Sequence, residues 1–292
     1  MENLCDGKCE NCKELNSCED PRKEYYLRGE KIKAGMSKVK HKIAVLSGKG
    51  GVGKSTVTAN LAKTFALNGK NQVGILDADI TGPSIPKLLG IREKKVSAGL
   101  PGIFPVKGPH GIKVISMDFF LEKDETPVIW RGPMKSIAIK QFLGDVEWGY
   151  LDYLLIDLPP GTGDEALTIM QSIPEINGAV IVTIPSDLSK IVVKKAVTFC
   201  RQLEIPVIGV IENMNGFVCP KCGYEEKIFS YGGGKKIANA LAIPFLGEIP
   251  LDRGVCEDSD KGTSFLVNHP NSPAAKSFLE IAGKICDYLN LN

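Results

Sequence analysis

The sequence predicts an α/β protein with a mostly parallel, doubly wound sheet that has helices on both faces, plus a short N-terminal cysteine-rich extension. Short apolar runs rich in β-branched residues alternate with helix-like segments from residue 42 onward. The run at residues 153–157 is apolar until it ends in a carboxylate, which is typical of a buried parallel strand that ends at a site. A glycine-rich stretch at residues 47–56 separates the first strand from the first helix of the alternating pattern.

The predicted elements follow one another in the order that such a sheet needs. The strand at 42–46 leads into the glycine-rich stretch, and an Asn-Gly pair closes the helix at 56–67. A glycine- and proline-rich insertion at 94–113, interpreted as a hairpin, precedes a strand at 113–117. Proline in the first turn favours a helix at 133–143. The other predicted strands are 72–77, 153–157, 179–184, 206–211 and 244–249, and the other predicted helices are 84–89, 188–203 and 272–289.

Composition and charge restrict the class of protein. A chain of 292 residues with 43% hydrophobic and 24% charged residues is ordinary for a soluble globular protein. Its net charge of +2 gives no field that favours nucleic acid or a membrane surface. No apolar stretch approaches the roughly 20 residues that span a bilayer, and the first residues do not resemble a signal peptide. We expect a cytoplasmic protein that binds neither nucleic acid nor membrane.

The chain divides into two parts of unequal size. Residues 1–40 hold four of the nine cysteines and a charged run with little apolar periodicity, so we expect a cysteine-rich N-terminal extension and linker. Residues 41–292 carry the alternating pattern and, at residues 48–55, the phosphate-binding pattern G-x-x-x-x-G-K-[ST], so we expect them to form a P-loop ATPase domain.

The glycine-rich stretch fits the phosphate-binding pattern G-x-x-x-x-G-K-[ST] and has the strand and helix that this pattern requires on either side. Glycines let backbone N–H groups crowd a phosphate, the helix N-terminus adds a positive dipole end, and Lys54 adds a charge. Lys49 is a second lysine inside the same loop. The residues expected to bind the nucleotide are Gly48, Lys49, Gly50, Gly51, Val52, Gly53, Lys54, Ser55 and Thr56.

Three acidic residues stand where strand ends would meet this loop. Asp157 ends its strand and is expected to hold Mg²⁺ together with the Ser55 hydroxyl, because magnesium keeps several waters and takes few protein ligands. Asp77 and Asp79 follow an earlier strand, and Asp79 is better placed to hold the water that attacks the γ-phosphate. The alternative for Asp79 is a turn-forming role before Gly82.

Cys219 and Cys222 form a C-x-x-C pair whose two thiolates can bind one metal from the same side. A closed tetrahedral site needs four ligands, and the body of the chain has no second C-x-x-C. The missing two could come from a second copy across a two-fold axis. Half of a zinc ribbon is the main alternative, and a thioredoxin-like disulfide is weaker because the pair does not open a helix.

The N-terminal cysteines have the spacing C-x3-C-x2-C-x5-C, so four thiolates within fourteen residues could enclose one centre. Thiolate ligation suits zinc and an iron–sulfur cluster about equally. These four residues are Cys5, Cys9, Cys12 and Cys18. The cysteines expected to be buried packing residues are Cys200, Cys256 and Cys286.

Taken together, the motifs resemble the Mrp/ApbC family of MinD-like ATPases with a deviant Walker A loop. The glycine loop alone indicates only the ATPase superfamily, whereas Glu-Asn-Met at 212–214 followed by the C-x-x-C pair narrows it to this family. The matching segments are residues 48–56, 77–86, 130–134, 157–164, 212–214, 219–222 and 247–252.

The resemblance implies a homodimer that sandwiches ATP and carries a bridging [4Fe–4S] cluster on Cys219 and Cys222 of both chains. The cluster would then be passed to recipient apoproteins, and ATP hydrolysis would alter the hold on it. The N-terminal cysteines resemble the longer branch of the family, which carries a second [4Fe–4S] cluster there. Cys5 lies closer to Cys9 than in that branch.

The resemblance also implies roles for four residues of the nucleotide site. Lys49 would reach the partner's nucleotide, Asp79 would lie in the first switch, and Asp157 would end the Walker B strand. Asn213 would contact adenine. A second lysine is surplus within one subunit, but across a two-fold axis it would stabilise phosphate charge as an arginine finger does.

Three other functions compete with a cluster carrier. A MinD/ParA-like positioning ATPase would need a basic amphipathic tail or a DNA-binding patch, and residues 287–292 offer neither. In the nitrogenase iron protein the cluster ligands are differently spaced and lie elsewhere in the fold, which disfavours an electron donor of that kind. A zinc-stabilised P-loop NTPase remains open, although Lys49 argues against it.

Overall fold

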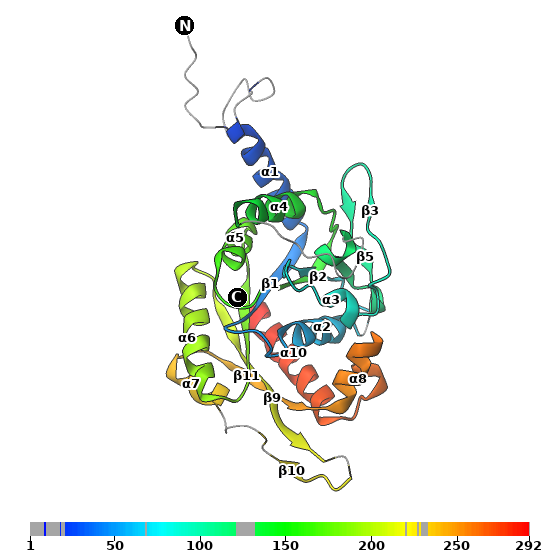
Figure 1. The fold of residues 1–292 in the computed structure, drawn as a ribbon, viewed down its shortest axis with the longest axis vertical. Helices are drawn as coiled ribbons and strands as arrows, with labels where there is room; N and C mark the ends of the chain where they lie inside the picture. The colour runs from blue at the N-terminus through cyan, green and yellow to red at the C-terminus, as the bar shows by residue number, and fades with distance from the viewer. Residues whose placement is uncertain are drawn as a thin grey trace.

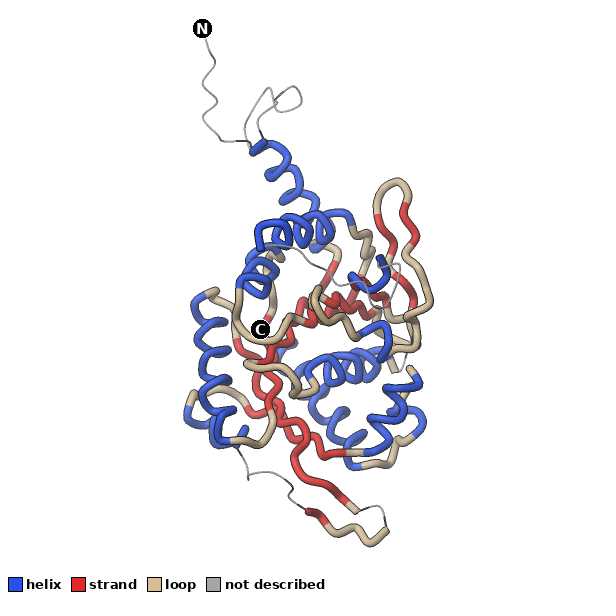
Figure 2. Tube along the Cα trace, in the orientation of Figure 1, coloured by secondary structure: helices blue, strands red, loops and turns tan. Residues whose placement is uncertain are grey.

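The computed structural model describes residues 9, 18, 21–67, 69–120, 132–219, 221–226, 228 and 233–291. Its centre is a sheet whose strands run through the middle of the molecule with helices on either side (Figure 1, Figure 2). The strands are β1 (Val39–Ser47), β2 (Val73–Asp77), β5 (Val106–Lys107), β6 (Lys113–Ser116), β7 (Leu151–Asp157), β8 (Gly178–Thr183), β9 (Val207–Val218), β10 (Glu225–Glu226) and β11 (Phe245–Leu251).

The order of the strands is β10-β9-β8-β1-β7-β2-β6-β5, and β11 also pairs with β9. The neighbouring pairs are parallel except at β5–β6 and at β9–β10. A separate hairpin of β3 (Ser97–Ala98) and β4 (Ile103–Phe104) lies in the insertion where a hairpin is predicted. The predicted fold class, a mostly parallel sheet with helices on both faces, is therefore confirmed.

The helices cover two faces of the sheet. They are α1 (Pro21–Met36), α2 (Lys54–Ala66), α3 (Ile85–Leu88), α4 (Gly132–Asp145), α5 (Asp164–Ser172), α6 (Asp187–Gln202), α7 (Gly233–Ala240), α8 (Arg253–Lys261), α9 (Phe265–Asn268) and α10 (Pro273–Leu291). Helices α2 and α10 share one hydrophobic cluster with β1, whereas α1, α4 and α5 share another with the opposite side of that strand. A third, smaller cluster joins α6 and α7 to β8 and β9.

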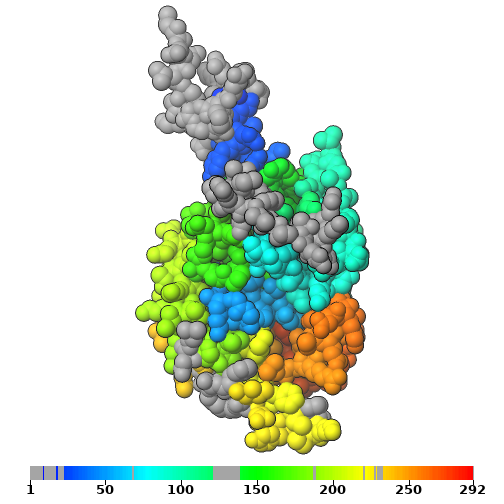
Figure 3. Space-filling view, viewed as in Figure 1, coloured from blue at the N-terminus to red at the C-terminus, as the bar shows by residue number. Residues whose placement is uncertain are grey.

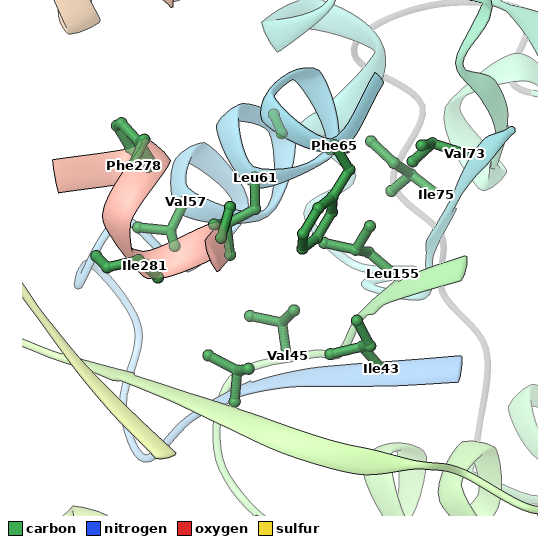
Figure 4. Packing of buried hydrophobic residues seen from close by; sticks show 14 of the residues in the cluster. Ile43, Val45, Val57, Leu61, Phe65, Val73, Ile75, Leu155, Phe278 and Ile281 are labelled. Atoms are coloured by element: carbon green, nitrogen blue, oxygen red, sulfur yellow. The ribbon is translucent and has the colours of Figure 1, made fainter. Parts of the chain in front are cut away.

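The cluster under α2 fixes the helix that follows the glycine loop. In Figure 4, Leu61 and Phe65 of α2 point toward Val45 and Leu155 of the sheet, and Phe278 comes from α10. Burial of each such side chain stabilises the fold by about 1.5–3 kcal/mol. Helix α2 is therefore packed against β1 and β7, and its first turn meets the end of β7 where Ser55 contacts Asp157.

Two stretches differ from the sequence prediction. Residues 21–36 form helix α1 where a linker is predicted, because Ile32 and Met36, four residues apart, bury their side chains in the cluster that contains α4. Strand β9 continues to Val218, well past the predicted end at residue 211. Among the described residues, none of the helices has the length and apolarity needed to cross a membrane.

Candidate nucleotide site and C-x-x-C hairpin

The phosphate loop joins β1 to the N-terminus of the 13-residue helix α2. Gly51 and Gly53 have φ of 77° and 76°, in the left-handed region that favours glycine. A Cβ on Gly53 would also collide with the Asn213 side chain. The loop thus has the backbone conformation that lets N–H groups converge on a phosphate, and it fits the predicted nucleotide.

The Asp157 carboxylate is the buried centre of the site. It accepts hydrogen bonds from the Ser55 hydroxyl at 2.6 Å and from the Thr58 hydroxyl at 2.7 Å. The Lys54 ammonium lies 2.8 Å from its Oδ1. The Asp157 side chain is fully buried, and three donors compensate for the loss of water. A hydroxyl and a carboxylate in contact at a helix N-terminus are a donor set that fits Mg²⁺.

Asp77 lies beside Asp157, because the two residues are partners in the pairing of β2 with β7. Its Oδ2 accepts from the Ser116 hydroxyl at 3.0 Å and from the backbone N–H groups of Ser84 and Ile85 at 3.2 Å. Burial, and next the charge of Asp157, raise the pKa of Asp77 to about 8. Asp77 therefore ties β2 to α3 and β6, a role that the sequence does not indicate.

Asp79 is half-buried on the loop after β2. Its Oδ1 accepts from the Thr81 hydroxyl at 2.9 Å and from the Gly82 N–H at 3.1 Å. These are the contacts of a turn-forming aspartate, the alternative raised from the sequence. The other carboxylate oxygen takes no part in these two bonds, so holding a water stays a prediction.

Lys49 is half-buried at the start of the loop. Among the described residues its ammonium group makes no hydrogen bond or ion pair, in contrast to that of Lys54. A cation of this kind can contact a group outside its own subunit.

A cavity of about 320 Å³ opens beside the loop. Asn213 lines it and donates from Nδ2 to the Val52 carbonyl at 2.9 Å. Met214, Pro250 and Cys256 lie around the same cavity, whose far wall is α8. In Figure 3 the blue surface around residue 50 lies between the green surface near residue 160 and the orange surface of α8. The expectation that Cys256 is a buried packing residue is wrong, because its side chain is exposed here.

The other two isolated cysteines lie in the fold's interior or near it. Cys200 is buried, as predicted, and burial raises the pKa of its thiol to about 12. Cys286 is half-buried on α10, with its sulfur 3.6 Å from the Tyr153 hydroxyl.

The C-x-x-C pair lies in a tight turn between β9 and β10, and this ribbon projects from the end of the molecule opposite α1 (Figure 1). The Cys219 N–H donates to the Tyr224 carbonyl at 2.9 Å, and the Gly223 N–H donates back to the Cys219 carbonyl at 2.8 Å. Backbone N–H groups of Cys222 and Lys221 donate to the Cys219 sulfur and lower the pKa of that thiol. Amides directed at sulfur favour the thiolate form that binds metals.

The described part of the chain has no group of three or more His, Cys, Asp or Glu side chains that could hold a metal. Within that part, the turn supplies two thiolates, Cys219 at its base and the exposed Cys222. Of the N-terminal cysteines, Cys9 and Cys18 are described, whereas Cys5 and Cys12 lie outside the described residues. Residues 130 and 131 of the matching segments also lie outside them.

A parallel sheet, a glycine loop on a helix N-terminus and a buried carboxylate opposite its hydroxyl define a P-loop NTPase. A family model described as "ParA: NUBPL iron-transfer P-loop NTPase" matches residues 38–286. The chain is 54% identical over 283 residues to an iron-sulfur cluster carrier protein of Methanocaldococcus jannaschii, covering 97% of each chain. It is 53% identical over 262 residues to one of Saccharolobus solfataricus, covering 90% of this chain and 88% of that one. The chain belongs to the Mrp/ApbC family of P-loop NTPases.

Solved structures agree with this assignment. A nucleotide-binding protein in complex with ADP from Archaeoglobus fulgidus has a TM-score of 0.74 and 45% identity, covering 86% of this chain and 96% of that one. The septum site-determining protein MinD of Pyrococcus horikoshii, complexed with Mg-ADP, has a TM-score of 0.60 at 23% identity, covering 84% of this chain and 96% of that one. The second likeness shows the fold alone.

Proposed function

We propose that the protein is an ATP-binding and ATP-hydrolysing iron–sulfur carrier. In this proposal it assembles a [4Fe–4S] cluster at a homodimer interface and transfers it to recipient apoproteins. The observation that carries the proposal is that one strand, β9, joins the phosphate loop through Asn213 to a C-x-x-C turn with only two thiolates. The relatives named as cluster carriers support the same cargo.

The nucleotide half of the proposal uses the residues around Asp157. Lys54 and the backbone of the glycine loop bind the phosphates, and Ser55 and Asp157 hold Mg²⁺, which neutralises phosphate charge when bound. Asp79 orients the attacking water, and Asn213 contacts adenine at the wall of the cavity. Lys49 of one subunit stabilises the phosphate charge in the site of the other.

The cargo half of the proposal rests on the C-x-x-C turn. Two thiolates from each chain complete a four-thiolate site when two turns meet across a two-fold axis. The amides that favour the Cys219 thiolate support a metal ligand over an inert thiol. We propose that Cys5, Cys9, Cys12 and Cys18 hold a second centre, either a [4Fe–4S] cluster or zinc.

Anaerobic reconstitution with iron and sulfide tests the cargo. We expect Cys219→Ser/Cys222→Ser to lose about two iron atoms per chain, half of a bridging [4Fe–4S] cluster, with the corresponding visible absorbance. Cys256→Ser is the matched control, because this exposed cysteine lies at the nucleotide cavity instead. The control should keep wild-type iron, and both proteins should still bind ATP.

Two results would contradict the carrier. One is equal iron content in the double variant and the wild type. The other is stoichiometric zinc in the purified protein together with no transfer of a cluster to an apoprotein, which would favour the zinc-stabilised NTPase.

A further inference from the structure

Glu212 is a buried acidic residue of β9 to which the proposed chemistry gives no role. Its side chain is fully buried, and its Oε2 accepts a hydrogen bond from the Gly234 N–H at the start of α7. Its Oε1 is also buried and has no hydrogen-bond partner among the described residues. Burial raises the pKa of Glu212, so placing a carboxyl group here carries a cost. Such a group needs an explanation beyond packing.

Two glycines at the start of α7 lie close to this carboxyl group. A Cβ on Gly234 would lie 2.7 Å from the Glu212 Oε2 and 3.0 Å from its Cβ, so a larger residue here would displace the Glu212 side chain. A Cβ on Gly233 would lie 3.6 Å from the same oxygen and 3.9 Å from the backbone nitrogen of Ser186. Ser186 caps helix α6. Glu212 therefore lies where the N-termini of α6 and α7 come together.

Two contacts lead from this point to the phosphate loop. The next residue of β9, Asn213, donates to the Val52 carbonyl in the loop. On the other side, Val192 of α6 lies against the start of the loop, since a Cβ on Gly48 would come within 2.5 Å of the Val192 Cβ. A movement of the loop would thus reach Glu212 through β9 and through α6.

In the opposite direction, Glu212 lies in the strand that leads into the hairpin that carries the cysteines, and it contacts the helix that follows this hairpin in the chain. The hairpin begins as β9 passes Val218 and turns at Cys219 and Cys222. After it, the next helix or strand of the described chain is α7, whose first turn is the segment bonded to Glu212. One side chain joins the strand that enters the hairpin to the helix that follows it.

We propose that Glu212 is a positioning residue that couples the phosphate loop to the C-x-x-C hairpin by fixing the start of α7 to β9. It touches neither the nucleotide nor the cargo. The inference deepens the proposed function, since the hairpin it moves is the proposed cargo site. Because it concerns the position of the hairpin, it can be tested without iron.

The experiment measures alkylation of individual cysteines by iodoacetamide in the full-length apo protein, with and without ATP, by mass spectrometry. Cys219 and Cys222 report the hairpin, and Cys256, which lines the cavity, reports nucleotide occupancy in the same sample. In the wild type we expect ATP to change the hairpin alkylation rates by about fivefold or more, the range of a typical coupling free energy. ATP should also protect Cys256.

Glu212→Ala should abolish the ATP effect on Cys219 and Cys222 while Cys256 stays protected. Glu212→Gln keeps an acceptor for the Gly234 N–H and should retain most of the effect. The control is Glu280→Ala, an exposed acidic residue of α10, which should behave as the wild type. Protection of Cys256 in each variant shows that it is folded and binds ATP.

Unchanged hairpin coupling in Glu212→Ala would overturn the inference, and so would a wild-type hairpin that does not respond to ATP. If Glu212→Gln lost as much of the coupling as Glu212→Ala, the inference that the coupling depends on the hydrogen bond from the Gly234 N–H would be overturned. None of these results depends on iron. Failure of the carrier proposal appears separately, as absent iron in the reconstituted wild type.

Discussion

The carboxyl group of Asp77 is buried against a second carboxylate, and this makes stability depend on pH. The pKa of Asp77 is raised from 3.8 to about 8 by burial and by Asp157. A carboxyl group with a raised pKa binds its proton more tightly in the folded state. The stability it contributes is fully present below the unfolded pKa and is lost as the pH rises through the folded pKa.

Asp77→Asn should remove this dependence, because the amide does not ionise. Between pH 5 and pH 9 we expect the wild-type melting temperature to fall more than that of the variant, by at least about 2–4 °C. Differential scanning calorimetry without nucleotide measures this. Asp260→Asn, an exposed carboxylate on α8, is the control and should keep the wild-type pH response. If the melting temperatures of all three proteins changed equally between pH 5 and pH 9, the raised pKa of Asp77 would be contradicted.

At the scale of elements, the packing of helix α1 shows whether the N-terminal part of the chain docks on the P-loop domain. Met36 is fully buried, and α1 packs with α4. We expect Met36→Ala to lower the free energy of unfolding by about 2–5 kcal/mol, the range for a large-to-small change in a core. Urea titration gives the value. Leu27→Ala, on the exposed side of the same helix, should change stability by less than about 0.5 kcal/mol. A negligible loss for Met36→Ala would mean that α1 behaves as a linker.

The phosphate loop and helix α1 differ in how much of their structure could be predicted from the sequence. The contact of Ser55 with Asp157 follows from motif positions, because the ends of parallel strands meet at one edge of a sheet. Helix α1 is not predictable in this way, since Ile32 and Met36 are the two buried side chains among its residues 23–36, and two such residues produce almost no apolar periodicity. Apolar patterns reveal an element only when it has a broad buried face.

Contacts between polar groups that are distant in sequence are even harder to predict from the sequence. The Thr58 hydroxyl reaches Asp157 across 99 residues, and Glu212 reaches Gly234 across 22. Neither pair belongs to a sequence motif that would indicate the contact, so each contact becomes visible only in the folded structure. Cys256 shows the same limit, because a cysteine in a helical pattern carries no sign of which side faces a cavity.

At the scale of the whole molecule, each nucleotide site of the proposed homodimer contains residues from both subunits. We expect Lys49→Ala to lower ATP hydrolysis by about 10³-fold or more, as loss of an arginine finger does, while iron binding is spared. Lys54→Ala should also be inactive, because in the proposed site Lys54 binds the phosphates of the nucleotide in its own subunit. A normal hydrolysis rate in Lys49→Ala would exclude the role of Lys49.

Mixing the two inactive variants separates action in the same subunit from action in the partner. In a mixed dimer, the Lys49→Ala chain keeps Lys54 in its own phosphate loop and meets the Lys49 that the Lys54→Ala chain retains. Equal mixing should therefore restore about a quarter of wild-type activity, since half of the dimers are mixed and each has one complete site. No recovery after verified subunit exchange would place Lys49 in its own subunit's site.

The two borders of the sheet limit how copies of this chain can associate. β5 has two residues and runs antiparallel to its neighbour. At the opposite border, β10 also has two residues and pairs antiparallel with β9. β11, which pairs with β9 as well, contains Pro250, which has no N–H to donate, and its register with β9 shifts at two places. Short, irregular borders and proline are the devices by which sheets resist edge-to-edge aggregation. Backbone pairing between sheets, which would extend into open filaments, is therefore disfavoured, and self-association is left to side chains and loops that can form a closed pair.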